Sequence, residues 1–184
     1  MTGVIKGKLY VVSGCFMAEP PWGYFEECNP LFFRYNPVTD RWVTLPPPFT
    51  EAIGPIIGGV IGGKFYVMAG SPYTHDARFV VYDPVTNQWT TRTPLGLSRP
   101  GAASAVLDGK LYVMGGSRYN AKTETWETLD ITIVYDPATD AWTRRASLPG
   151  PRTDLTASRV YLNGQPRIEL VGGIAPGNNL QYVP

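Results

Sequence analysis

Short runs of β-branched and aromatic residues recur along the chain, and each run ends at glycine. They occupy residues 7–14, 63–70, 109–116 and 167–173. Runs of this length, bounded by glycine, are typical of buried β-strands and are too short for the helices of a globular domain. The final glycine indicates a backbone position that leaves no room for a Cβ. The pattern therefore predicts an all-β chain.

A second pattern lies between these runs. Residues 35–42, 82–89 and 135–142 share the motif Tyr-Asx-Pro-x-Thr-Asx-x-Trp. Proline presets φ for a turn, and the Asx side chain can bond the backbone ahead of it, so each copy predicts a tight hairpin. We expect the tryptophan that begins each returning strand to lie in the core. These residues are Trp42, Trp89 and Trp142.

Runs of small residues precede three of the glycine-ended strands, at 54–61, 101–107 and 153–162. Small side chains suit a strand that is crowded by its neighbours near a central axis. The Gly-Gly, Asp-Gly and Asn-Gly pairs that follow these runs are strong hairpin signals. Each unit is thus predicted to have four antiparallel strands: A (small residues), B (ending at glycine), C (ending at Tyr-Asx-Pro) and D (starting at Trp). Their period of roughly fifty residues is typical of propeller blades.

The glycine pair after a hydrophobic strand, followed by the Tyr-to-Trp motif, resembles the Kelch repeat. This resemblance covers nearly the whole chain and implies a β-propeller with blades of four antiparallel strands. The approximate blade boundaries are 1–47, 48–95, 96–149 and 150–184. The first blade is expected to lack part of strand A, and the last to lack strand D. We therefore expect a partial propeller or one closed by oligomerisation, with a truncated gene product as the alternative.

Composition restricts the classes of partner. The 184 residues carry 16 Lys and Arg against 15 Asp and Glu, a net charge of +1. No long-range field therefore favours a nucleic acid or an anionic membrane. Glycine interrupts the longest apolar runs, so no segment is expected to span a bilayer. Cys15 and Cys28 lie at both ends of one B–C interval, where a disulfide and two free thiols both remain open. The sequence indicates no compartment.

Few residues could carry metal or acid–base chemistry. His75 is the only histidine; beside Asp76 and near Tyr73, it is either a base or a solvated loop residue. One histidine and two cysteines cannot build a four-ligand zinc site without carboxylates. Nor can one histidine supply the two-His, two-Tyr copper site of galactose oxidase, whose blade architecture is similar. No phosphate loop or dinucleotide-binding glycine motif is present. We predict no metal, no cofactor and no catalytic residue.

The B–C and D–A connections of a four-stranded meander lie on one face of a propeller. Here they are long and varied, whereas the A–B and C–D turns are short and stereotyped. Irregular loops on a rigid scaffold are where binding residues concentrate. The candidate ligand- or partner-binding residues are Trp22, Glu51, Tyr73, His75, Arg78, Arg99, Arg118, Tyr119, Trp126 and Arg152. The unrepeated interval 117–130, expected to be an irregular loop, is the strongest candidate.

Two pairs of these residues have alternatives. Arg99 and Arg152 hold equivalent places before strand A, which the Kelch resemblance puts at the mouth of the channel. They either contact a ligand or cap loop carbonyls. Trp22 and Trp126 either pack within their own loops or act as exposed aromatic anchors.

These observations favour a non-catalytic module that uses the B–C and D–A face to bind a protein or peptide. Two alternatives stay open. One is a carbohydrate-binding or carbohydrate-active propeller that resembles a sialic-acid mutarotase. The other is a propeller fragment that assembles into a homo-oligomer and binds no ligand.

Overall fold

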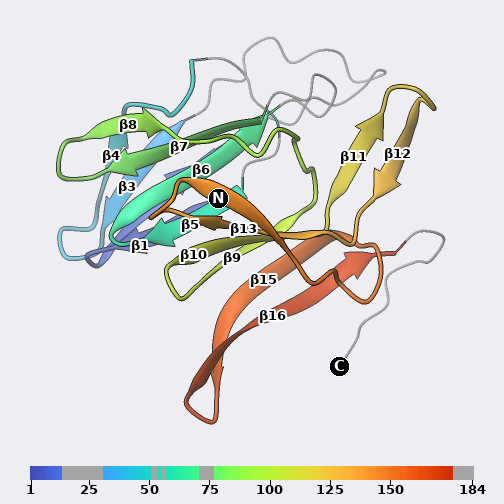
Figure 1. Cartoon of the computed structure of the whole chain (residues 1–184). Coiled ribbons are helices and arrows are strands. Elements are labelled where there is room, and N and C mark those ends of the chain that lie inside the picture. Colours follow the sequence, from blue (N-terminus) through green and yellow to red (C-terminus); the bar gives the residue numbers. More distant parts are fainter. Residues whose placement is uncertain (14–30, 51–53, 55–56, 71–76, 176–184) are drawn as a thin grey trace.

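A computed structural model describes residues 1–13, 31–50, 54, 57–70 and 77–175 of the chain. All regular elements in these ranges are β-strands (Figure 1). The all-β prediction is therefore confirmed, and no helix in the described ranges could cross a membrane.

Three antiparallel four-stranded sheets form blades 1, 2 and 3. Blade 1 holds β1 (Thr2–Ile5), β2 (Lys8–Val12), β3 (Phe32–Asn36) and β4 (Arg41–Leu45). Blade 2 holds β5 (Ile57–Ile61), β6 (Lys64–Gly70), β7 (Ala77–Asp83) and β8 (Gln88–Thr91). Blade 3 holds β9 (Ala103–Leu107), β10 (Lys110–Met114), β13 (Thr132–Asp136) and β14 (Ala141–Arg145). Within each blade the strands neighbour one another in chain order, as predicted for strands A to D.

Two hairpins complete the described structure. Strands β11 (Ser117–Asn120) and β12 (Thr125–Thr128) are inserted between β10 and β13 of blade 3. Strands β15 (Thr153–Leu162) and β16 (Gln165–Ile174) supply strands A and B of the fourth unit. The four-stranded Kelch-type blade is thus confirmed, while closure by oligomerisation stays a prediction.

The A–B turns have the backbone that their sequences predict. In blade 3 the φ angles of Asp108 and Gly109 are 49° and 70°, and those of Gly62 and Gly63 in blade 2 are 57° and 75°. A two-residue turn with positive φ at both positions matches the twist of the flanking strands. This turn therefore fixes the register of strands A and B.

The C–D turns are held by the side chains of the Tyr-to-Trp motif. In blade 3 the Tyr135 hydroxyl donates to Asp140 Oδ1 at 2.6 Å, and the Ala138 amide donates to Asp136 Oδ1 at 2.9 Å. Asp140 takes a left-handed φ of 52°. The same contacts recur in blades 1 and 2. Tyr135 lies directly opposite Trp142 in the ladder, so the motif fixes one turn and one cross-strand aromatic pair.

The inner strands of adjacent blades lie side by side, β1 with β5, β5 with β9, and β9 with β15. Ser104 Oγ on β9 accepts from the Gly58 amide at 3.1 Å and donates to the Gly58 carbonyl at 2.9 Å. A Cβ at Gly59 on β5 would overlap the Val106 side chain on β9 of the next blade. The small residues of strand A are therefore required where the blades converge.

The core lies between blades. One cluster joins blades 1 and 2, and a second joins blades 2 and 3. In the second, Phe79 of blade 2 meets Tyr135 of blade 3 edge-on at 4.7 Å between ring centroids. Trp142 Nε1 donates to the Thr93 carbonyl at 2.8 Å, across the same junction. In the first, Trp89 Nε1 donates to the Pro46 carbonyl at 2.9 Å. The indole N–H groups of Trp89 and Trp142 thus both donate to carbonyls of the preceding blade.

Trp42 differs from its two counterparts. Its side chain is 56% exposed, whereas Trp89 and Trp142 are partly buried and pack against the core clusters. The prediction that all three lie in the core is wrong for Trp42. The motif gives the ring a place on its own sheet, but burial requires a second blade against that face, and no described residue covers it.

The tryptophans offer a matched test of this packing. Trp142→Ala is expected to destabilise the protein by about 2–4 kcal/mol, because it removes a partly buried aromatic ring and a hydrogen bond between blades. Trp42→Ala is expected to cost less than about 1 kcal/mol. Urea unfolding of both variants measures the difference. Equal costs would contradict the view that the contact between blades gives this tryptophan its energetic weight.

Asp140 predicts a component of acid sensitivity. The hydrogen bond from Tyr135 and the bond from the Thr93 amide lower the pKa of this carboxyl below its usual value. Its contribution is therefore complete above the usual carboxyl pKa and is lost as the pH falls through the lowered value. Asp140→Asn keeps the acceptor, as Asn87 does in blade 2. We expect this variant to unfold near the wild-type midpoint at pH 7 and to lose less stability in acid. Superimposable pH profiles would contradict the assignment.

Candidate functional site

The interval 117–130 contains a β-hairpin, which corrects the prediction of an irregular loop. Tyr119 pairs with Trp126 across its two strands, and Asn120 pairs with Thr125. The segment from Tyr119 to Trp126 reads Tyr-Asn-Ala-Lys-Thr-Glu-Thr-Trp. It is a fourth copy of the Tyr-to-Trp motif, with alanine in place of proline and glutamate in place of the second Asx. Its Tyr-to-Trp spacing was the signal that could have revealed the hairpin.

The turn of this hairpin follows the same local rules as the turns of the blades. The Lys122 amide donates to Asn120 Oδ1 at 3.0 Å, and Glu124 takes a left-handed φ of 53°. The same Asx bond occurs in the turns of the blades, so here it forms without the constraint of a proline. A C–D-type hairpin therefore stands within the B–C connection of blade 3. In Figure 1 it projects beyond the blades.

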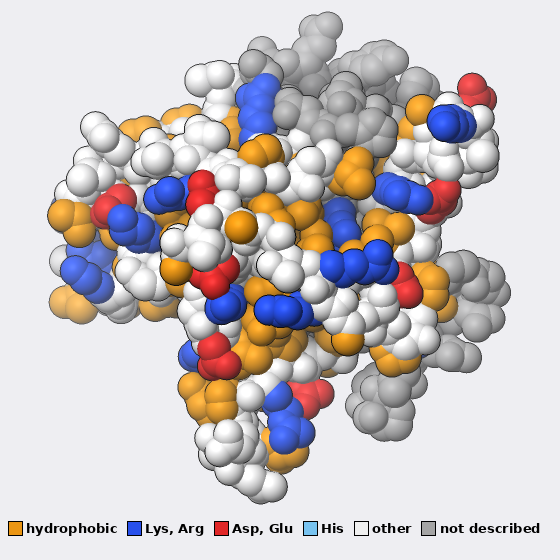
Figure 2. All heavy atoms as spheres, in the orientation of Figure 1, with side chains coloured by type: hydrophobic (Ala, Val, Ile, Leu, Met, Phe, Trp, Pro, Cys, Tyr) orange, Lys and Arg blue, Asp and Glu red, His pale blue; other side chains and the backbone are white. Residues whose placement is uncertain are grey.

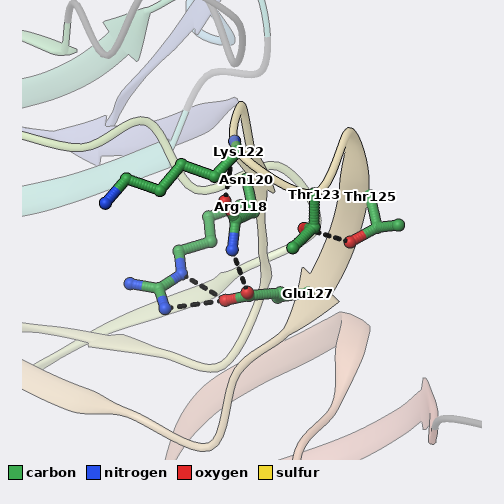
Figure 3. Close-up of polar contacts among 6 residues, drawn as sticks. All are labelled: Arg118, Asn120, Lys122, Thr123, Thr125 and Glu127. Carbon is green, nitrogen blue, oxygen red and sulfur yellow. Dashed lines mark hydrogen bonds and ion pairs between the residues drawn. The ribbon is translucent and has the colours of Figure 1, made fainter.

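One side of hairpin β11–β12 carries a polar network (Figure 3). Arg118 donates from Nε and Nη2 to Glu127 Oε2, each at 2.7 Å, and Asn120 Nδ2 donates to Glu127 Oε1 at 2.6 Å. These bonds, from Asn120 first and Arg118 second, lower the pKa of the Glu127 carboxyl. The network couples the two strands, because Arg118 and Asn120 lie on β11 and Glu127 lies on β12. Its members alternate with the aromatic pair along the strands, so the two groups lie on opposite sides of the hairpin.

The other side of the hairpin is aromatic. The rings of Tyr119 and Trp126 meet edge-on at 5.6 Å between centroids. Trp126 nevertheless remains 46% exposed. It therefore packs within its own hairpin, one of the two alternatives considered, and also presents apolar surface to solvent.

The base of the hairpin is fixed to both neighbouring D–A segments. The Ser117 amide donates to the Pro100 carbonyl at 2.9 Å, and the Gly116 amide donates to the Arg152 carbonyl at 2.8 Å. The Arg152 amide donates in turn to the Leu129 carbonyl at 3.0 Å. Gly116 has a φ of 86°, and a Cβ there would crowd Ala102. The hairpin therefore has a defined place beside the segments that lead into β9 and β15.

Arg99 lies in one of these D–A segments and is only 7% exposed. Its Nη1 donates to the Ile131 carbonyl at 3.1 Å, and its buried Nε has no hydrogen-bond partner in the described part of the chain. Burial, followed by the charges of Arg144 and Arg118, lowers the pKa of Arg99 to about 10. Arg99 thus caps a loop carbonyl, as one interpretation expected, and its role toward a ligand stays a prediction.

The remaining candidates are distributed differently. Arg152 is partly buried and joins the site through its backbone. Arg78 lines a hollow of about 400 Å³ with Phe49, Phe79 and Arg92, and no hairpin residue contributes to that lining. Trp22, Glu51, Tyr73 and His75 lie outside the described residues, as do Cys15 and Cys28.

Among the described residues no group of His, Cys, Asp and Glu side chains could hold a metal ion. Four of the described candidates and their partners meet around the hairpin base, namely Arg99, Arg118, Glu127 and Arg152. Tyr119 and Trp126 lie on the two strands of the hairpin, β11 and β12. These groups can donate hydrogen bonds to an acceptor and stack on apolar surface. They form an arrangement suited to recognition.

Comparison with known proteins agrees with the blade geometry. The family model of the Kelch motif matches residues 98–149, the part of the chain that forms blade 3 and the inserted hairpin. The chain belongs to the Kelch-repeat family. The predicted resemblance is therefore confirmed.

Several Kelch proteins are similar to this chain. A Kelch-like protein of Aspergillus terreus is 32% identical over 187 aligned residues, which cover 95% of this chain and 37% of that protein. A putative F-box/kelch-repeat protein of Arabidopsis thaliana is 33% identical over 70% of this chain and 32% of its own length. The human Kelch repeat and BTB domain-containing protein 12 is 25% identical over 83% of this chain and 26% of its own length. The chain thus spans about a third of the length of these relatives or less.

The polar network predicts how the hairpin is held. Glu127→Ala removes the acceptor shared by Arg118 and Asn120, so amide hydrogen exchange across residues 117–128 is expected to become several-fold faster. Exchange in β9 and β10 should be unchanged. Glu169→Ala, which alters an exposed carboxylate on β16, serves as the control. Unchanged exchange in the Glu127 variant would show that the base alone orders the hairpin.

Proposed function

We propose that this chain is a non-catalytic module that binds a polypeptide partner through hairpin β11–β12 and the D–A segments at its base. The observation that carries the proposal is the aromatic side of the hairpin, where Trp126 is 46% exposed and packs edge-on against the partly buried Tyr119. Tyrosine and tryptophan supply large contact areas with few rotatable bonds, and they are enriched where partners bind most tightly.

The order of the hairpin supports this role. An isolated two-stranded hairpin is only marginally stable in water. Here the Glu127 network ties the strands together, and bonds to the Pro100 and Arg152 carbonyls tie the base to two D–A segments. A surface that is ordered before binding loses less conformational entropy when a partner docks.

The relatives add independent support. Their names join Kelch repeats to an F-box in one case and to a BTB domain in another. Kelch repeats thus occur beside domains of other kinds, as expected for a module that contributes an interaction surface. The range that matches the Kelch motif, residues 98–149, includes the inserted hairpin.

A different observation favours assembly as a second function. On one face of blade 1, the ring of Trp42 on β4 lies against Phe33 and Tyr35, and Trp42 is 56% exposed. The equivalent face of blade 3 is covered by blade 2. We infer that this face of blade 1 is suited to contact another blade. Mass measurement in solution at several concentrations tests the idea, and a monomer at every concentration would contradict it.

The binding function can be tested by selection from a random-peptide display library. Wild-type protein is compared with a variant in which residues 117–128 are replaced by a short Gly-Ser linker, and with Trp126→Ala. Enriched peptides are expected to bind the wild type and to lose about tenfold or more in affinity toward both variants, because an aromatic anchor is removed.

Trp42→Ala provides a matched control, since it removes an exposed tryptophan from another blade. It should bind the selected peptides as tightly as wild type. The proposal would be refuted if no peptides were enriched, or if they bound the hairpin-less variant equally well. Binding to a glycan array without peptide binding would favour the carbohydrate alternative instead.

A further inference from the structure

The guanidinium of Arg99 is the buried charge that the fold explains least. Arg99 is 7% exposed, and the polar contact that the described chain gives its side chain is the bond from Nη1 to the Ile131 carbonyl. Its Nε is buried and has no hydrogen-bond partner there. Buried charges in proteins are normally paired with an opposite charge, since an uncompensated one is costly. A backbone carbonyl supplies only a partial negative charge.

The charged neighbours of Arg99 increase this imbalance. Two other arginines, Arg144 and Arg118, act on its pKa in the same direction as burial does. Arg144 is exposed on β14, opposite Ile133. Arg118 stands at the base of the hairpin with its side chain 43% exposed.

The Ser117 amide donates to the Pro100 carbonyl, so Arg118 and Arg99 each lie next to a residue of this bond. Arg99 in turn donates to the Ile131 carbonyl, two residues before Ile133, the partner of Arg144. The hairpin, a D–A segment and β14 therefore bring three arginines to one region of blade 3.

Within the described part of the chain, Arg118 is paired with the carboxylate of Glu127. Both oxygens of that carboxylate already accept hydrogen bonds. Its Oε2 accepts from Nε and Nη2 of Arg118, and its Oε1 accepts from Asn120. The third guanidinium nitrogen of Arg118 points away from Glu127, and the Lys122 amine extends to the same side (Figure 3). In the space-filling view, several Lys and Arg side chains lie near the middle of the drawn face, with Asp and Glu side chains among them (Figure 2).

We propose that Arg99, Arg118 and Arg144 together bind a carboxylate side chain of an acidic segment in the polypeptide partner. This inference rests on the proposed function and names the chemical class of the segment. The planar guanidinium fork fits a carboxylate with two parallel hydrogen bonds. Exposed Arg144 and partly exposed Arg118 attract the acidic segment, while Arg99 adds its positive charge from a buried position. The aromatic side of the hairpin holds the flanking apolar residues.

The test uses peptides enriched on the wild-type protein. Their sequences are expected to contain Asp or Glu far above the frequency in the starting library. Each acidic residue is then changed to its amide, which keeps the shape and removes the charge. Amide substitution at the recognised position should weaken binding by about tenfold or more, and the affinity for the acidic peptide should fall as salt rises.

Variants on the protein side identify the arginines. Arg144→Ala changes an exposed side chain, so the fold should be retained, and it is expected to weaken binding of the acidic peptide several-fold. Arg118→Ala is expected to do the same, and its hydrogen exchange across residues 117–128 is measured as well, because this variant also loses the bonds to Glu127. Binding of the amide peptide should be unaffected. Arg41→Ala, an exposed arginine on the outer strand of blade 1, is the matched control and should bind as wild type does. Arg99→Lys is measured with its unfolding midpoint, so that loss of affinity is separated from loss of fold.

The outcomes separate the two proposals. Enriched peptides without an acidic excess, or acid and amide peptides of equal affinity, would overturn the carboxylate assignment and leave the peptide-binding function standing. Equal effects of the Arg144, Arg118 and Arg41 variants would overturn it as well. If no peptide is enriched, both proposals fail, and binding to sialylated or phosphorylated ligands alone would assign the arginines to a different anion.

Discussion

Trp142 of blade 3 donates its indole hydrogen to the Thr93 carbonyl of blade 2, and its ring packs against Phe79 of the same blade. The rest of the structure depends on this kind of contact. A four-stranded sheet has two faces, and here the apolar residues of each face are buried only when another blade lies against it. Trp42 shows the consequence, since the same motif leaves its ring exposed where no described blade lies against that face.

The inserted hairpin uses the local turn chemistry of the blades for another purpose. Its Asx residue, its left-handed turn position and its Tyr–Trp pair match those of the C–D turns. In blades 2 and 3, the indole of the tryptophan donates to a carbonyl of the preceding blade. Trp126 instead stands on a projecting hairpin and remains half-exposed. A motif that stabilises the scaffold in one place therefore offers a contact surface in another.

The basic group beside this hairpin arises from three parts of the chain that are far apart in sequence. Arg99, Arg118 and Arg144 come from a D–A segment, from β11 and from β14. Sequence position singled out Arg99 and Arg118, each for a separate reason, and gave no reason to connect them. No sequence pattern pointed to Arg144, because it lies in strand D, two residues after the repeat tryptophan. Only the folding of blade 3 brings these charges together.

The amino-acid sequence alone determined the strands, the hairpin turns and the repeating blade, because these depend on contacts between residues close in the chain. Proline, Asx side chains and glycine act within a few positions, and Tyr135 and Trp142 meet through one tight turn. Burial was decided by tertiary structure. Whether a tryptophan is covered, whether an arginine lies beneath a loop, and which charges share a surface depend on the neighbouring blade, and no local pattern encodes that neighbour.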